Sequence, residues 1–129
     1  MNKLISFSLV IVTFLFSSLV FAGGHSKGMY IHIINFNITG IDRSQYEAAA
    51  MKLTSVFAAV PGLKRKHWLA NEENNTYGGV YVFDSKESHD AFVESELYAG
   101  VKGNPSFSNF SGKSFENIDS LAKHTRGTE

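Results

Sequence analysis

Histidine is the side chain that titrates closest to neutral pH, and the sequence contains five of them. His32 lies in an apolar, β-branched stretch, where it could serve as a general base or be a buried histidine with its hydrogen bonds satisfied. None of the histidines has the H-x-H or H-x-x-x-H spacing that brings two ligands to one metal, and the chain has no cysteine. We therefore predict no metal site. The histidines are His25, His32, His67, His89 and His124.

Signatures of nucleophilic catalysis and of phosphate binding are also missing from the sequence. There is no G-x-S-x-G motif and no cysteine nucleophile. The pair Gly78-Gly79 precedes a strand-like run rather than a helix, so it does not fit a phosphate-binding loop. We expect this pair to let a backbone segment or a bulky side chain pass close by.

Length and charge limit the range of functions further. A chain of 129 residues forms one domain at most. Its 12 Lys and Arg residues balance its 12 Asp and Glu residues, whereas nucleic-acid-binding proteins have a basic excess or a basic face. We therefore expect no nucleic-acid partner. Without cysteine, neither a disulfide framework nor a lipoprotein anchor is available.

Residues 1–22 have the pattern of a secretory signal peptide. Lys3 supplies a short positive start, residues 4–22 are apolar apart from Ser and Thr, and Ala22 ends a cleavage-site pattern. The apolar run is nearly long enough to span a bilayer, so a retained anchor is the alternative. We predict export to the periplasm or the medium, with no stable membrane association after cleavage. The predicted divisions are a signal peptide at 1–22, a flexible lead-in at 23–28, a domain at 29–123 and a tail at 124–129.

Four stretches rich in β-branched and aromatic residues predict strands. Two of them lie within residues 61–83, where the only tryptophan stands on the first and Gly78-Gly79 opens the second. In the last stretch we expect an irregularity near Gly112. The predicted strands are residues 29–37, 63–70, 77–83 and 106–117.

Two further stretches have apolar residues at helical spacing. The first begins with a possible capping box formed by Ser44 and Glu47, and the Pro-Gly pair that follows it stops the helix. The second has Asp84 as its N-cap and is ended by Gly100. The predicted helices are residues 44–60 and 84–98.

The predicted order is β-α-β-β-α-β, which is the ferredoxin-like plan of the α+β class. Two helices can cover only one face of a four-stranded sheet. The first and third strands nevertheless have apolar or aromatic side chains on both faces. A second copy of the chain would cover the remaining face, so we expect a homodimer.

This plan, combined with the runs PGLKRKHW and YGGVYVF, resembles the YdhR-type mono-oxygenases of the dimeric α/β-barrel superfamily, which also contains the antibiotic-biosynthesis mono-oxygenases. The likeness extends over about residues 29–123, and its motifs indicate the fold better than a reaction. An export signal departs from the usual family pattern. The matching residues are Pro61, Gly62, Lys66, Trp68, Gly78, Gly79, Tyr81, Phe83, Lys113 and Phe115.

The resemblance implies a pocket lined with aromatic residues, either between helices and sheet or inside the barrel formed by two sheets. It also implies oxidation of a small aromatic or quinol-like compound by dioxygen without a cofactor, in which the protein binds, deprotonates and excludes water. On this analogy, the candidate catalytic residues are His32 and Asn35, and the candidate substrate-binding residues are Trp68, Tyr81, Phe83 and Lys66.

Other functions stay open at this point. The same aromatic residues would suit a core or a dimer interface, and Lys66 would suit a solvated face. A non-catalytic exported protein that binds a small apolar ligand, or a purely structural dimer, would fit the same sequence. Haem-degrading relatives place an iron-ligating histidine just after the second helix, where residues 98–103 contain none, so we do not expect haem.

Overall fold

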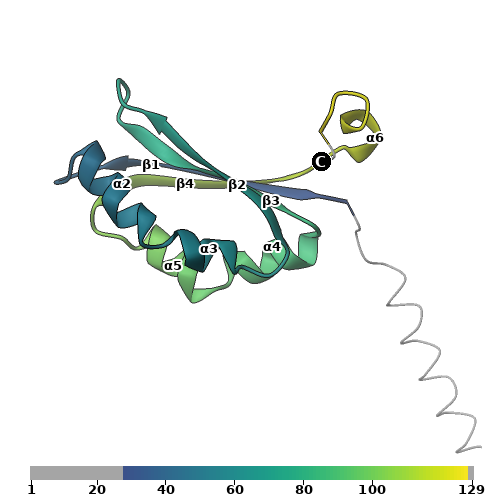
Figure 1. Ribbon diagram of the computed structural model, residues 1–129, viewed down its shortest axis with the longest axis horizontal. Helices are drawn as coiled ribbons and strands as arrows, with labels where there is room; N and C mark the ends of the chain where they lie inside the picture. Colours follow the sequence, from purple (N-terminus) through teal and green to yellow (C-terminus); the bar gives the residue numbers. More distant parts are fainter. Residues whose placement is uncertain (1–27, 128–129) are drawn as a thin grey trace, which may run out of the picture.

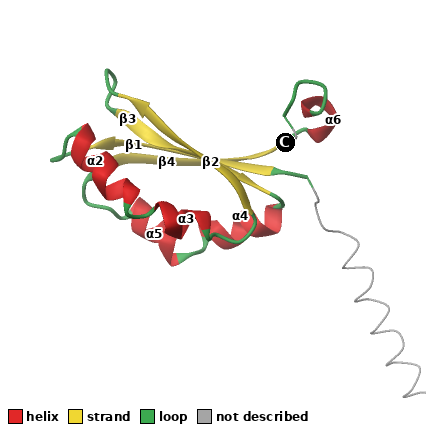
Figure 2. Cartoon of the chain, in the orientation of Figure 1, coloured by secondary structure: helices red, strands yellow, loops and turns green. Residues whose placement is uncertain are grey.

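The computed structural model describes residues 28–127, so the predicted leader at 1–22 lies outside the described residues. Four antiparallel strands form one sheet in the order β2-β3-β1-β4, and helices cover one of its faces (Figures 1 and 2). The predicted β-α-β-β-α-β arrangement is confirmed. The strands are β1 (Tyr30–Ile38), β2 (Leu63–Asn71), β3 (Thr76–Phe83) and β4 (Phe107–Glu116).

The central strand β1 alternates between the two sides of the sheet, as its sequence pattern predicts. His32, Ile34 and Phe36 face the helices, and each is at most 4% exposed. Ile31 and Ile33 point to the other face and remain half-buried. Successive residues of a strand point to opposite faces, so a one-residue shift of register would exchange the two sets.

Each predicted helix is in fact two shorter helices. The first is divided into α2 (Arg43–Met51) and α3 (Thr54–Ala58). The N-cap is Asp42 rather than Ser44: the Asp42 carboxylate accepts from the Gln45 N–H at 2.8 Å, and the Gln45 side chain accepts from the Asp42 N–H at 2.9 Å. This reciprocal pair satisfies two backbone donors and forms the capping box, two residues before the predicted one.

The second helix is divided into α4 (Lys86–Val93) and α5 (Glu96–Lys102). Ser85, rather than Asp84, caps α4, which ends at the C-cap Glu94, and Ser95 caps α5 by accepting from the Tyr98 N–H at 3.2 Å. Short hydroxyl side chains compete with helical hydrogen bonds, so a serine inside the apolar pattern marks a break. The predicted end at Gly100 was also wrong, because the C-cap is Gly103.

The irregularity in β4 lies a few residues before the predicted position at Gly112. The pairing of β1 with β4 shifts register between Asn35 and Asn37, opposite a bulge of β4 in which Asn109 has a φ of 53°. Asparagine adopts this left-handed conformation more readily than most residues. Gly112 itself faces the helices, where a Cβ atom would overlap the Tyr98 hydroxyl.

The glycine pair of β3 has the expected role, and each glycine accommodates a different neighbour. A Cβ atom on Gly78 would overlap the backbone carbonyl oxygen of Ile34, so the strands β1 and β3 could not approach as they do. A Cβ atom on Gly79 would lie 2.7 Å from the Lys66 Nζ atom. The pair thus admits a backbone segment at one position and a side chain at the next.

The C-terminal part of the chain stands apart from the helical layer. The short helix α6 (Asp119–Ala122) lies beyond the end of β4, away from the other helices (Figure 1). Ile118 is 58% and Leu121 is 63% exposed, so this segment presents apolar surface to solvent. Within residues 28–127, no helix has the length and hydropathy needed to cross a membrane.

Candidate functional site

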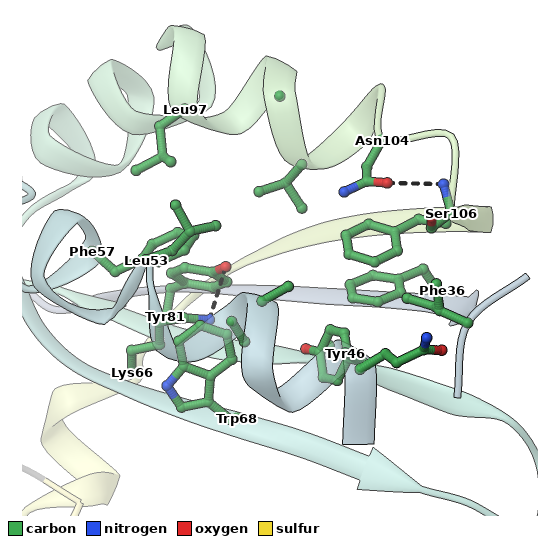
Figure 3. Close-up of a pocket in the computed structure, with 18 of the residues that line it drawn as sticks. Phe36, Tyr46, Leu53, Phe57, Lys66, Trp68, Tyr81, Leu97, Asn104 and Ser106 are labelled. Carbon is green, nitrogen blue, oxygen red and sulfur yellow. Dashed lines mark hydrogen bonds between the residues drawn. The ribbon is translucent and has the colours of Figure 1, made fainter. Parts of the chain in front are cut away.

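A cavity of about 480 Å³ lies between the sheet and its helical layer (Figure 3). Residues of α2, α3, α5 and the loop before β4 form one wall, and side chains of the sheet form the other. This volume suits a small organic ligand, since such sites typically measure about 300–1,000 Å³. The cavity therefore lies on the helix-covered face of the sheet, not on its uncovered face.

The walls of this cavity are rich in aromatic rings. Phe36 and Phe107 stack at one end, with ring centroids 3.9 Å apart and planes inclined by 15°. At the other end Trp68 meets Phe57 edge to face at 5.6 Å, and Trp68 is 42% exposed, which places it at the edge of the cavity. Flat apolar walls of this kind favour a planar apolar ligand. The six aromatic lining residues are Phe36, Tyr46, Phe57, Trp68, Tyr81 and Phe107.

Lys66 brings an amine into these apolar surroundings. Its Nζ atom donates a hydrogen bond to the Tyr81 hydroxyl at 3.0 Å and lies 3.6 Å from the Trp68 ring centroid. Within residues 28–127, no carboxylate lies within ion-pair distance of this nitrogen. Burial lowers the pKa of Lys66 to about 7, although the neighbouring ring faces favour the ammonium form. The amine can therefore exchange a proton near neutral pH.

Two phenols in the cavity are held in their neutral form. Burial, with smaller contributions from Tyr46 and Tyr98, raises the pKa of Tyr81 well above its usual value. Burial also raises the pKa of Tyr46 to about 12, with help from Tyr77 and Glu47. Both hydroxyls thus keep their protons at physiological pH and can donate hydrogen bonds to a ligand.

His32 lies outside this cavity, in a separate buried network that joins four elements. Its Nε2 atom is 3.0 Å from the Tyr98 hydroxyl, and its Nδ1 atom is 2.9 Å from the Ser114 Oγ atom. His89 Nε2 is 2.8 Å from the same Ser114 oxygen, and His89 Nδ1 is 2.8 Å from an Asp90 oxygen. Both ring nitrogens of each histidine are therefore occupied.

The Asp90 carboxylate indicates which atom donates and which accepts in these hydrogen bonds. The Lys86 ammonium, and then His89, hold the pKa of Asp90 below its usual range, so Asp90 is a carboxylate and only accepts. His89 consequently carries a proton on Nδ1, and as a neutral imidazole it accepts on Nε2 from the Ser114 hydroxyl. His32 then donates from Nδ1 to Ser114 and accepts the tyrosine hydroxyl proton on Nε2. In this arrangement each hydrogen bond of the network has one donor and one acceptor, and His32 is uncharged.

We predict that stability falls in acid because of this network. Burial, and then the charge of His89, lowers the pKa of His32 from 6.5 to about 4. The unfolded chain therefore binds this proton more readily, so the stabilisation is complete above about pH 7 and is lost as pH falls from 6.5 through 4. Urea titrations should show a loss of about 2 kcal/mol between pH 7.5 and 4.5.

Two variants separate this effect from general acid destabilisation. His32→Gln should flatten the pH dependence of the unfolding free energy, because no group at that position would titrate. His124→Gln, at an exposed histidine, should leave it unchanged. An unchanged profile in His32→Gln would show that His32 does not cause the acid sensitivity. Among the described residues, the charged or titratable groups that face His32 are Tyr81 on β3, His89 on α4 and Tyr98 on α5.

The remaining candidate residues lie apart from the cavity. Asn35 is on the sheet face that points away from the helices, and it pairs with Gly78 and Ser111. Phe83 is fully buried in the core, with its ring 5.4 Å from that of Phe92. The structure thus brings together Lys66, Trp68 and Tyr81 at the cavity, and it places His32, Asn35 and Phe83 elsewhere.

Several residues of the cavity were not among the sequence candidates. Tyr46 belongs to the apolar stripe of α2, and a stripe of this kind indicates core rather than a site. Phe36 shares a strand face with His32, and Phe107 lies in a Ser-rich stretch, so only their packing against each other identifies them. Within residues 28–127, no group of three or more His, Asp or Glu residues could hold a metal ion.

Comparisons with known proteins agree on the fold. Residues 31–128 match the model of the family described as "Putative mono-oxygenase ydhR". No curated protein matches the chain. Among solved structures, SnoaB of Streptomyces nogalater, described as a cofactor-independent oxygenase, is similar with a TM-score of 0.56 and 16% identity, covering 68% of this chain and 91% of that one.

Two further structures have the same fold. A "putative antibiotic biosynthesis monooxygenase" from Caulobacter crescentus aligns with a TM-score of 0.58 and 14% identity, covering 73% of this chain and 93% of that one. A "dimeric ferredoxin-like protein of unknown function" from Thermobifida fusca aligns with a TM-score of 0.56 and 20% identity, covering 73% of this chain and 96% of that one. These likenesses concern the fold alone.

Proposed function

Because this chain belongs to the ydhR family of mono-oxygenases, we propose that it oxidises a small, planar, electron-rich aromatic compound with dioxygen and without a cofactor. The observation that carries the proposal is the cavity itself, in which flat apolar walls surround one amine that titrates near neutral pH. Such a site can bind an aromatic ring, remove a proton from it and keep bulk water away.

The proposed reaction converts a phenol with a free para position into a quinone. A base removes the hydroxyl proton, and the electron-rich para carbon of the phenolate reduces dioxygen and forms a C–O bond. Loss of water from the resulting peroxide leaves the quinone. The two hydrogens lost from the substrate leave as water, one oxygen atom of dioxygen enters the quinone, and the other enters that water. No external reductant is needed.

Lys66 is the group best suited to act as the base. It lines the cavity, whereas His32 has both ring nitrogens engaged outside it. A base whose pKa is about 7 is half neutral at physiological pH and can accept a proton from a phenol. The Tyr81 hydroxyl, 3.0 Å from the amine, can donate a hydrogen bond to the negative oxygen that forms.

Oxygen uptake tests this function. The purified chain, treated with a chelator, is mixed with planar phenols such as 1-naphthol in ¹⁸O-labelled dioxygen. Uptake that depends on both substrate and folded protein, with one labelled oxygen in the quinone, would support the proposal. If the phenols raise the melting temperature without uptake, the chain is a binding protein for apolar ligands. If they do neither, the cavity is not a site for this class of compound.

We also propose that the chain forms a homodimer through the uncovered face of the sheet. Ile31 and Ile33 of β1 and Val80 of β3 are half-buried on this face, and no helix of residues 28–127 covers it. Phe115 of β4 is 46% exposed there. An extended apolar sheet face is costly in water, and a second copy would bury it. The dimeric description of the Thermobifida fusca relative supports this arrangement.

Sedimentation should therefore give the mass of two chains at micromolar concentration. Ile33→Glu places a charge in the middle of the uncovered face and should shift the population to monomer. Lys64→Glu, at an exposed position of β2, is the matched control and should remain dimeric. A wild-type chain that sediments as a stable monomer would overturn this arrangement.

A further inference from the structure

We propose that the cavity also captures planar apolar aldehydes and ketones covalently, through an imine formed on the Nζ atom of Lys66. This reactivity needs neither dioxygen nor an oxidisable substrate, so it stands independently of the oxygenase proposal. Three features of the described residues carry it: the isolation of the amine, the environment of its charged product and a nearby proton donor.

The amine is accessible to a ligand and has few competing partners. Lys66 lines the cavity, and its only hydrogen bond within residues 28–127 goes to the Tyr81 hydroxyl. No carboxylate of these residues pairs with it, so no ion pair holds the nitrogen in its charged, unreactive form. Its lowered pKa is consistent with this, because desolvation favours the neutral amine with a free lone pair.

The rings around Lys66 also suit the product. A protonated imine has its positive charge at the same nitrogen, which lies 3.6 Å from the Trp68 centroid, 4.1 Å from that of Tyr81 and 4.7 Å from that of Phe57. The faces of aromatic rings attract such a cation. The aryl group of the captured aldehyde would meanwhile lie against the apolar walls. The site thus favours both halves of the adduct.

Imine formation releases one water molecule and requires no oxidant or reductant. The nitrogen lone pair attacks the carbonyl carbon, an N–C bond forms, and a proton moves from nitrogen to oxygen to give a carbinolamine. The hydroxyl then leaves as water while the nitrogen lone pair forms the C=N bond. The Tyr81 hydroxyl, 3.0 Å from the nitrogen, is placed to protonate the departing oxygen, and it then regains a proton from solvent so that the protonated imine keeps its own. Because burial raises the pKa of Tyr81, its hydroxyl is protonated before the reaction and has a proton available for the departing oxygen.

Gly79 gives the amine its position. Its missing side chain leaves the space that the Lys66 amine occupies, since a Cβ atom there would lie 2.7 Å from Nζ. The nearest neighbour is the end of a flexible side chain, and the His67 carbonyl oxygen and the Tyr81 ring lie farther off at 3.2 Å, so Gly79→Ala should displace the amine with only small shifts of the strand. The strand thus sets how far the amine reaches into the cavity.

Trapping with a reducing agent tests the proposal on the full chain. The protein is incubated at pH 7 with 2-naphthaldehyde and sodium cyanoborohydride, which converts an imine into a stable secondary amine, and modified lysines are located by peptide mass spectrometry. We expect Lys66 to be modified at least about tenfold faster than Lys64, an exposed lysine two residues away on the same strand, because only Lys66 lies in the cavity, where the apolar walls hold the aryl group beside its desolvated amine. Equal rates at the two lysines would overturn the proposal.

Variants extend the test without relying on a single substitution. Lys66→Arg should abolish the fast phase of modification, whereas Lys64→Arg should leave it unchanged. Tyr81→Phe should slow trapping at Lys66 without moving it to another lysine, because the ring stays in place while the hydroxyl that hydrogen-bonds the amine and supplies the proton is lost. If Lys66→Arg fails to fold, the mapping of the wild-type chain still decides the question. Fast modification that persists in a folded Lys66→Arg variant would contradict the assignment.

Discussion

Replacing Lys66 by methionine is expected to lower the rate of phenol-dependent oxygen uptake by about 10²–10⁴-fold, the usual contribution of a positioned general base. The methionine side chain has a similar length and fills the same space between the rings, but it has no group that accepts a proton. The loss should therefore appear in kcat. Phenol binding, measured as a rise in melting temperature, should persist because the apolar walls are unchanged.

The same substitution should leave the fold intact. Lys66 is a largely buried amine that pairs with no carboxylate of residues 28–127, so its replacement by an apolar side chain removes a desolvation cost. We expect the melting temperature of Lys66→Met to equal or exceed that of the wild type. Lys64→Met is the matched control, because Lys64 is exposed on the same strand and should affect neither uptake nor binding.

If uptake in Lys66→Met stays within about threefold of the wild-type rate, another group must remove the proton, because a lost base has a far larger effect. His32→Gln would then be the next variant to assay. Since His32 lies outside the cavity, a strong effect of that variant on kcat would require a relay through the buried histidine network.

Replacing Gly78 by alanine is expected to destabilise the protein by at least about 3 kcal/mol, which is in the range of severe single substitutions. The added Cβ atom would overlap the carbonyl oxygen of Ile34, a backbone atom of the central strand that cannot move without disturbing its pairing. The φ of 155° at Gly78 adds strain, because side chains other than glycine rarely adopt it. Urea denaturation would measure the loss as a lower midpoint with an unchanged slope.

Gly40→Ala separates the two causes. Gly40 also has a positive φ, of 79°, but a Cβ atom there would meet nothing within 4 Å. That variant should lose only about 1 kcal/mol, the cost of the backbone conformation alone. Equal losses at Gly40 and Gly78 would show that β1 and β3 do not approach as closely as described. A larger loss at Gly78 would confirm that close approach makes glycine necessary there.

The sequence was sufficient to predict the sheet and the side that each strand residue faces. The alternation in β1 is a local property with a period of two residues, so His32 and Phe36 could be placed on one face without knowledge of the fold. The glycine pair could likewise be interpreted, because a glycine in a strand usually marks a close approach. The helix boundaries were less predictable, because Asp42 and Ser95 had to be chosen among several residues with similar capping ability.

The choice between a site residue and a core residue depended on tertiary contacts. His32 is held by Ser114, which is 82 residues away in the chain, and by Tyr98, which is 66 residues away, so no local pattern distinguishes this buried histidine from a base in a pocket. Lys66 shows the reverse. From its position in an alternating strand, Lys66 could have pointed to solvent. Only the packing of Phe57 and Trp68 around it buries the amine and lowers its pKa. The sequence alone determined the fold and its two apolar faces, because periodicity is local. The tertiary structure decided which polar groups are desolvated, because desolvation depends on segments far apart in the chain.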